Sequence, residues 1–101
     1  MEKRIMLQNL LEKILGNRQV YFQPPESVSM SYPAIKYSRS NMNVKHADDS
    51  IYLQRVRYEI IVIDRKPNNQ IVEELLKLPY CSYDRGYKSN NLNHDVLTLY
   101  Y

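Results

Sequence analysis

The sequence IYLQRVRYEIIVID, residues 51–64, has the strongest β-strand pattern in the chain. One face of this strand would carry Tyr52, Gln54, Val56, Tyr58, Ile60 and Val62, and the other Leu53, Arg55, Arg57, Glu59, Ile61 and Ile63. The first half is charged on the second face, whereas residues 60–63 are apolar on both faces. This pattern predicts a central strand that is covered on both faces at one end and projects past the core at the other.

Four further segments precede this strand. Residues 34–40 (AIKYSRS) alternate apolar and polar side chains and predict a second strand with one wet face. Residues 19–23 (QVYFQ) predict a short strand that ends at two prolines, because proline cannot continue a β-ladder. Residues 2–15 predict an amphipathic helix, which Gly16 stops. Residues 41–50 are polar and without period, and this long loop is a candidate for function or for ordering on assembly.

The C-terminal third predicts a second helix and a hairpin. Asn68 or Asn69 caps the helix, whose apolar stripe runs from Ile71 to Leu78, and Pro79 ends it. Residues 80–88 and 92–101 then form the two arms of a hairpin. The order is α-β-β-β-α-β-β, which predicts a single α+β domain over residues 1–101. We expect a small antiparallel or mixed sheet of about five strands, with two helices packed mainly on one face.

Composition excludes several classes of protein. The net charge is +3 and the pI is near 9.0, but the basic residues are scattered, so polyanion binding is permitted without being predicted. One cysteine excludes an internal disulfide framework and a multi-cysteine zinc site. No apolar run approaches the roughly 20 residues of a membrane span. We expect a soluble protein made in the cytoplasm.

The aromatic residues are mostly tyrosine. Ten tyrosines against one Phe and no Trp favour half-buried sheet faces and protein contacts.

The sequence offers few candidates for catalysis. His46 lies near Asp48 and Asp49, and His94 precedes Asp95, but both groups are in polar loop or hairpin sequence where solvated side chains or turn capping are expected. A nucleophilic Cys81 paired with His94 across the hairpin would be a further candidate. Only two glycines are present, which nearly excludes a phosphate-cradling loop. We predict no catalytic, cofactor or metal site.

The charged half of the central strand allows three interpretations. Arg55, Arg57 and Glu59 could contact nucleic acid, a partner subunit or only water. The opposite face of the same half carries Tyr52, Val56 and Tyr58. A projecting strand with tyrosine on one side and mixed charge on the other is typical of an interface.

Several of these segments together resemble a known family. They are VYFQPPESVSMSYPAIKYSRSN, ADDSIY, QRVRYEIIVIDRKPNN, IVEELLKLPY and YDRGYKSNNLNHDVLTLYY. This succession resembles the small tail terminator proteins of long-tailed bacteriophages, also called tail completion or tail-to-head joining proteins. The resemblance runs through almost the whole chain. It depends on the Tyr-Pro before the strand at residues 32–37, Asp-Ser-Ile-Tyr at 49–52 and Tyr-Asp-Arg at 83–85.

The resemblance implies a structural protein without enzymatic activity. Such proteins form a ring, usually a hexamer, that stops growth of the tail tube and offers a docking surface to the head connector, while DNA passes through the lumen unread. The chain would then act in the virion at the tail-head junction, and in the bacterial host cytoplasm during assembly. The implied subunit or neck contacts are at Lys45, His46, Asp48, Asp49, Tyr52, Arg55, Arg57 and Tyr58. The alternatives are a head-completion or connector protein, a small nucleic-acid-binding or regulatory domain and, third, a small enzyme.

Overall fold

The predicted order of helices and strands is confirmed by the computed structural model, which describes residues 3–26, 28–40, 56–67 and 70–101. In chain order the elements are α1 (Lys3–Leu15), β1 (Val20–Phe22), β2 (Ala34–Arg39), β3 (Arg57–Asp64), α2 (Gln70–Leu76), β4 (Cys81–Ser89) and β5 (Leu92–Tyr100). The helix α2 ends earlier than predicted, because the amides of Lys77 and Leu78 turn back onto the carbonyls three residues before them.

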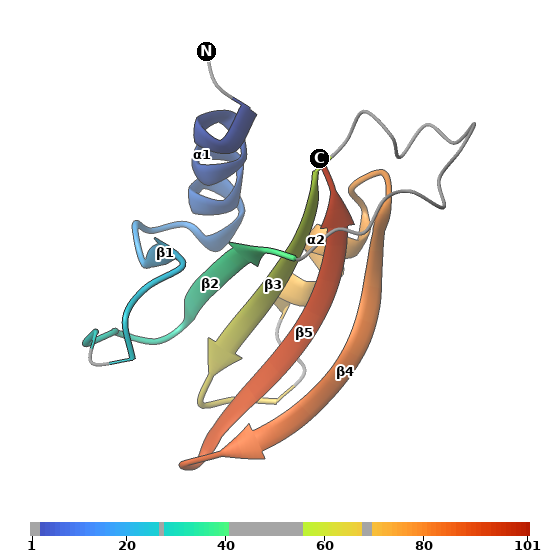
Figure 1. Cartoon of the computed structure of the whole chain (residues 1–101). Coiled ribbons are helices and arrows are strands. Elements are labelled where there is room, and N and C mark those ends of the chain that lie inside the picture. The colour runs from blue at the N-terminus through green and yellow to red at the C-terminus, as the bar shows by residue number, and fades with distance from the viewer. Residues whose placement is uncertain (1–2, 27, 41–55, 68–69) are drawn as a thin grey trace.

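The strands form one five-stranded sheet in the order β1-β2-β3-β5-β4 (Figure 1). Strands β1 and β2 are parallel and every other neighbouring pair is antiparallel, so the sheet is mixed. Strand β3 lies in the middle, with Ile60 opposite Tyr37 on β2 and Leu97 on β5. The central position predicted for this strand is therefore confirmed.

Both helices pack on the same face of the sheet, as predicted. The helix α1 buries Leu7, Leu11 and Leu15, which recur at helical spacing, and α2 buries Leu75. The core that these side chains share with the sheet comprises Leu7, Leu11, Leu15, Val20, Ile35, Tyr37, Tyr58, Ile60, Val62, Leu75, Leu97 and Leu99. We call the sheet face that meets the helices the helix face, and the other one the open face.

The open face has a smaller apolar cluster of its own. Ile61, Ile63 and Val96 lie on this face, and Met30 and Tyr32 from the connection between β1 and β2 pack against them. The cover explains why the second half of β3 is apolar on both faces, as the sequence pattern indicated. The first half of the predicted strand, residues 51–55, lies outside the described residues.

Strands β4 and β5 form a long curved hairpin whose turn lies at the end of the sheet remote from both termini (Figure 1). Asn90 and Asn91 have φ angles of 53° and 62°, so both central residues of the turn are in the left-handed region. Asparagine tolerates this region better than most residues, and a two-residue turn of this kind matches the twist of the strands. The hairpin predicted around residues 89–91 is thus confirmed.

The tyrosines divide into two groups. The partly exposed sheet positions that the tyrosine content favours are found at Tyr83 and Tyr87, which are 46% and 43% exposed. Tyr37 and Tyr58 also lie on strands, but they are 2% and 1% exposed and belong to the core. Their rings lie 5.9 Å apart between centroids. Tyrosine therefore supplies core volume here as well as surface.

Candidate interaction surface

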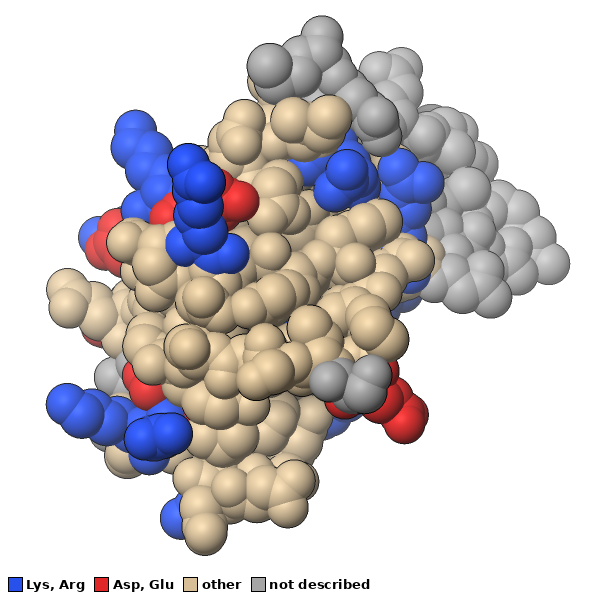
Figure 2. Space-filling model, turned by 90° about the vertical axis from the view of Figure 1, so that its left-hand side faces the viewer, with Lys and Arg blue, Asp and Glu red and all other residues tan. Residues whose placement is uncertain are grey.

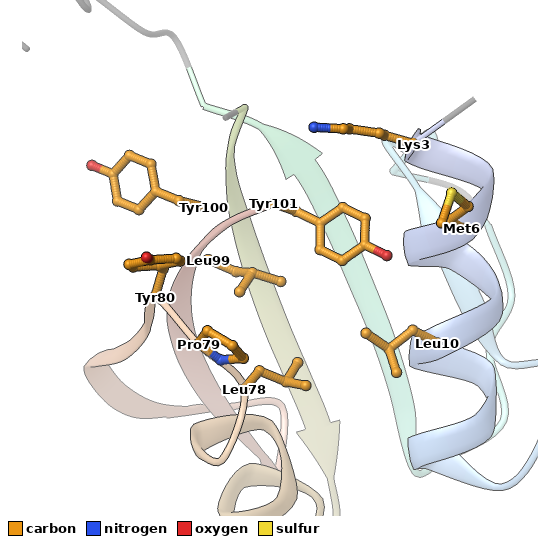
Figure 3. A pocket seen from close by; sticks show the side chains of 9 residues that line it. All are labelled: Lys3, Met6, Leu10, Leu78, Pro79, Tyr80, Leu99, Tyr100 and Tyr101. Atoms are coloured by element: carbon orange, nitrogen blue, oxygen red, sulfur yellow. The ribbon is translucent and has the colours of Figure 1, made fainter. Parts of the chain in front are cut away.

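An apolar groove of about 290 Å³ lies between the first turns of α1, the connection from α2 to β4, and the end of β5 (Figure 3). It is lined by Lys3, Met6, Leu10, Leu78, Pro79, Tyr80, Leu99, Tyr100 and Tyr101. Leu10 and Leu78 face each other across the groove, and the ring of Tyr101 points from the end of β5 toward α1 (Figure 3). We call this surface the apolar groove.

Three local features of the chain build the groove. Met6 and Leu10 are four residues apart on α1 and therefore lie on one side of the helix. Beyond α2, the chain passes Pro79 and turns at Tyr80, which has a φ angle of 60°. The Tyr80 carbonyl accepts a hydrogen bond from the Tyr100 amide at 3.1 Å, and this bond fixes the start of β4 beside the end of β5.

The groove is apolar, with one lysine among its lining residues. Lys3 is the charged residue that lines it, and the described first turn of α1 carries no acidic side chain. The next residue, Arg4, is not among the residues that line the groove. Its guanidinium lies 4.6 Å from the centroid of the Phe22 ring and donates a hydrogen bond to the hydroxyl of Tyr37 at 3.3 Å. Met6 and Tyr80 remain 45% and 39% exposed. Large apolar side chains that share one hollow are typical of a protein contact surface.

Most of the interface residues implied by the resemblance lie outside the described residues: Lys45, His46, Asp48, Asp49, Tyr52 and Arg55. The other two belong to β3 and have opposite surroundings. Arg57 is exposed and stands opposite Tyr100 in the register of β3 with β5. Tyr58 is buried in the core, because its alternation with Arg57 turns its side chain toward the helices. In this subunit Tyr58 therefore has a packing role and no surface to offer a neighbour.

The suggested pairing of Cys81 with His94 is wrong. In the hairpin register Cys81 stands opposite Leu99, whereas His94 stands opposite Tyr87, close to the turn. The two residues thus lie at different ends of the hairpin. Cys81 is half-buried, and burial raises the pKa of its thiol, which opposes formation of a nucleophilic thiolate.

His94 and Asp95 point to opposite faces of β5 and do not form a site together. The Nδ1 atom of His94 lies 3.2 Å from the carbonyl oxygen of Leu92, and its ring stacks on that of Tyr87. Asp95 accepts a hydrogen bond of 2.8 Å from the hydroxyl of Tyr83. Among the residues with described positions, no group of three or more His, Cys, Asp or Glu side chains could hold a metal ion.

The edge of the sheet formed by β4 is protected against the addition of a further strand. Strand β4 is an edge strand of nine residues that is exposed beyond its first residue, and a bulge interrupts its register between Tyr83 and Arg85. Arg85 pairs with Asp84 at 2.8 Å at the same point. Bulges and charged side chains are the usual devices that prevent edge-to-edge pairing. The groove is therefore a better candidate for protein contacts than this edge.

The distribution of charge also singles out no large polyanion surface on the side of the molecule shown in Figure 2. Lys and Arg lie in separate groups round the margin of this side, and uncharged side chains occupy its centre (Figure 2). Neither helix in the described ranges is long and apolar enough to cross a membrane. Comparison with protein-family models, with curated proteins and with solved structures found no match.

Proposed function

We propose that the chain is a non-enzymatic structural protein that assembles as a ring on the end of a phage or prophage tail tube, stops its polymerisation and joins tail to head. The observation that carries this proposal is the apolar groove, because it joins exposed apolar side chains from both ends of the chain in one hollow. The resemblance of the sequence to tail terminators supplies the particular function. The partners would be further copies of the chain, the tail tube protein and the head connector.

A ring needs enough surface on each subunit for two different contacts. A closed ring needs heterologous contacts, in which two different surfaces of each subunit meet. A standard contact covers about 800 Å² on each partner, which is roughly an eighth of the 6776 Å² surface of the subunit. Two such contacts would occupy about a quarter of the surface. The apolar groove would form the centre of one of them.

The test compares two variants that put the same charge on α1. Met6 lines the groove and Ile5 does not, although the two side chains are similarly exposed, at 45% and 40%. Light scattering and negative-stain microscopy of the unaltered chain should show concentration-dependent oligomers or rings. Met6→Lys should shift the population to monomer, because it places an ammonium in an apolar contact, whereas Ile5→Lys should leave assembly unchanged.

A second assay separates terminator from connector. A terminator added to polymerising tail tubes should arrest their length, whereas a head-completion protein should bind capsid connectors and leave tube length unaffected. The gene should also lie beside those for tail tube and tape-measure proteins. A chain that stays monomeric both alone and with tail tubes, or equal assembly by the Met6 and Ile5 variants, would contradict the proposal.

A further inference from the structure

The open face of the sheet carries a preformed pair of stacked aromatic rings, outside the groove. Tyr87 on β4 stands directly opposite His94 on β5. Their ring centroids are 4.7 Å apart and their planes differ by 10°. The contact of His94 Nδ1 with the Leu92 carbonyl holds the imidazole in place, and Tyr87 is 43% exposed. Each ring covers the inner face of the other, and an outer face of such a pair can receive a nucleobase, which stacks on aromatic rings. We call this pair of rings the platform.

A hollow of about 220 Å³ adjoins the platform. It lies between the connection that follows β1 and the turn of the β4–β5 hairpin, and its lining includes Tyr32, Lys36, Asn90 and His94. Because His94 belongs both to the stacked pair and to this hollow, a base placed in the hollow could extend the stack. Amide and ammonium groups at the rim can bond the polar edge of a base or its phosphate.

Two cations lie in the row of side chains next to the platform. The pairing register places Lys36, Ile61, Val96 and Arg85 in one row across four strands of the open face. Lys36 and Arg85 are thus three strand spacings apart, or about 14 Å. The Arg85 guanidinium also lies 6.0 Å from the centroid of the Tyr87 ring. Its ion pair with Asp84 leaves the arginine side chain 57% exposed, and such surface pairs exchange readily for other anions.

The geometry points to a binding site for single-stranded nucleic acid on the open face, in which a base stacks on the Tyr87–His94 pair and backbone phosphates contact Arg85 and Lys36. Unpaired bases are required, because a duplex keeps its ring faces stacked inside. Glu59 lies in the next row of the face and Glu26 lines the hollow, so their charges oppose the phosphates and affinity should be modest. This site does not depend on the assembly proposed above.

The test measures fluorescence anisotropy of a short labelled oligothymidylate, alone and as a duplex with oligoadenylate. The single strand should bind more tightly than the duplex. Tyr87→Ala should weaken binding of the single strand by roughly tenfold or more, and Tyr87→Phe should retain it, because stacking needs the ring and not the hydroxyl. Tyr83→Ala is the matched control. Tyr83 lies on the same strand and is similarly exposed, but it stands opposite Leu97 and its side chain is on the helix face of the sheet.

The salt dependence tests the two cations. Contact with two phosphates predicts a slope of about −1.4 for the logarithm of the binding constant against that of salt concentration. The double variant Lys36→Gln, Arg85→Gln should flatten this slope, whereas Lys88→Gln, on the helix-face side of β4, should not. Thermal unfolding verifies that every variant is folded. Absence of binding, equal binding of the duplex, full competition by free thymidylate, or equal losses in the Tyr83 and Tyr87 variants would each overturn the inference.

Discussion

The hydroxyl of Tyr37 connects the sheet to α1, and its removal should have a measurable cost. It donates a hydrogen bond of 2.6 Å to Gln8 Oε1 and accepts one of 3.3 Å from Arg4. The Gln8 amide nitrogen in turn donates to Glu12 and to the carbonyl of Val20, both at 3.0 Å. Tyr37→Phe keeps the ring in the core and deletes only the hydroxyl, so it isolates this network from the packing.

The expected loss follows from the burial of Tyr37. A typical intramolecular hydrogen bond contributes about 1 kcal/mol net, and a buried acceptor left without a donor costs more. Gln8 is only partly buried, so water can reach part of the amide. We therefore expect Tyr37→Phe to lower the free energy of unfolding by about 1.5 kcal/mol. For a domain of this size that corresponds to a fall in Tm of roughly 6–12 °C.

The assay is urea unfolding and thermal unfolding followed by circular dichroism. Tyr87→Phe is the control, because its exposed hydroxyl should change stability by less than about 0.5 kcal/mol. A double-mutant cycle with Gln8→Ala should give a coupling energy of about 1 kcal/mol between the two side chains. Equal stability of the Tyr37 and Tyr87 variants, or zero coupling in the cycle, would refute the assignment of this network.

Three more predictions concern the core, the turn and alkaline pH. Leu11→Ala, at a fully buried position of α1, should cost about 3 kcal/mol in urea unfolding, whereas Ile5→Ala on the exposed side should cost under about 1 kcal/mol. Asn91→Ala should destabilise the hairpin by about 1 kcal/mol because of the positive φ angle, and Asn91→Gly should not. Burial raises the pKa of the Tyr37 hydroxyl above the value of 10.0 that it has in the unfolded chain. The stability that the neutral hydroxyl contributes is therefore fully present below pH 10.0 and is lost as the pH rises through the pKa of the folded state. Tyr37→Phe should reduce the fall in the free energy of unfolding at alkaline pH.

Local pattern was sufficient to predict most of the fold. Alternation identified β3, and its doubly apolar second half indicated a central position between two covered faces. Paired asparagines between two strand-like runs located the hairpin. The same hairpin register would also have excluded the Cys81–His94 pair, because residues at such different distances from the turn cannot stand opposite each other.

The remaining features depend on contacts between distant parts of the chain. The partners of the Tyr37 hydroxyl come from α1, and no pattern within the strand distinguishes this buried tyrosine from the exposed Tyr87. The groove likewise combines residues of α1, the α2–β4 connection and the end of β5. The sequence signal for the groove was the apolar and aromatic character of Leu78 to Tyr80 and of the last residues. The end of α2 and the hairpin could have formed without these side chains.

The junction of β2 and β3 has a consequence for engineering. The amide of Ser40 donates a hydrogen bond of 2.9 Å to the carbonyl of Arg57, so the two strands are held together where the chain between them begins and ends. A short hairpin turn could therefore replace residues 41–55, and the shorter closure would gain about 1–2 kcal/mol. Such a shortened chain should keep the sheet and the groove while lacking Lys45, His46, Asp48, Asp49, Tyr52 and Arg55. Comparing its oligomers with those of the full chain would separate the contribution of that segment from that of the folded body.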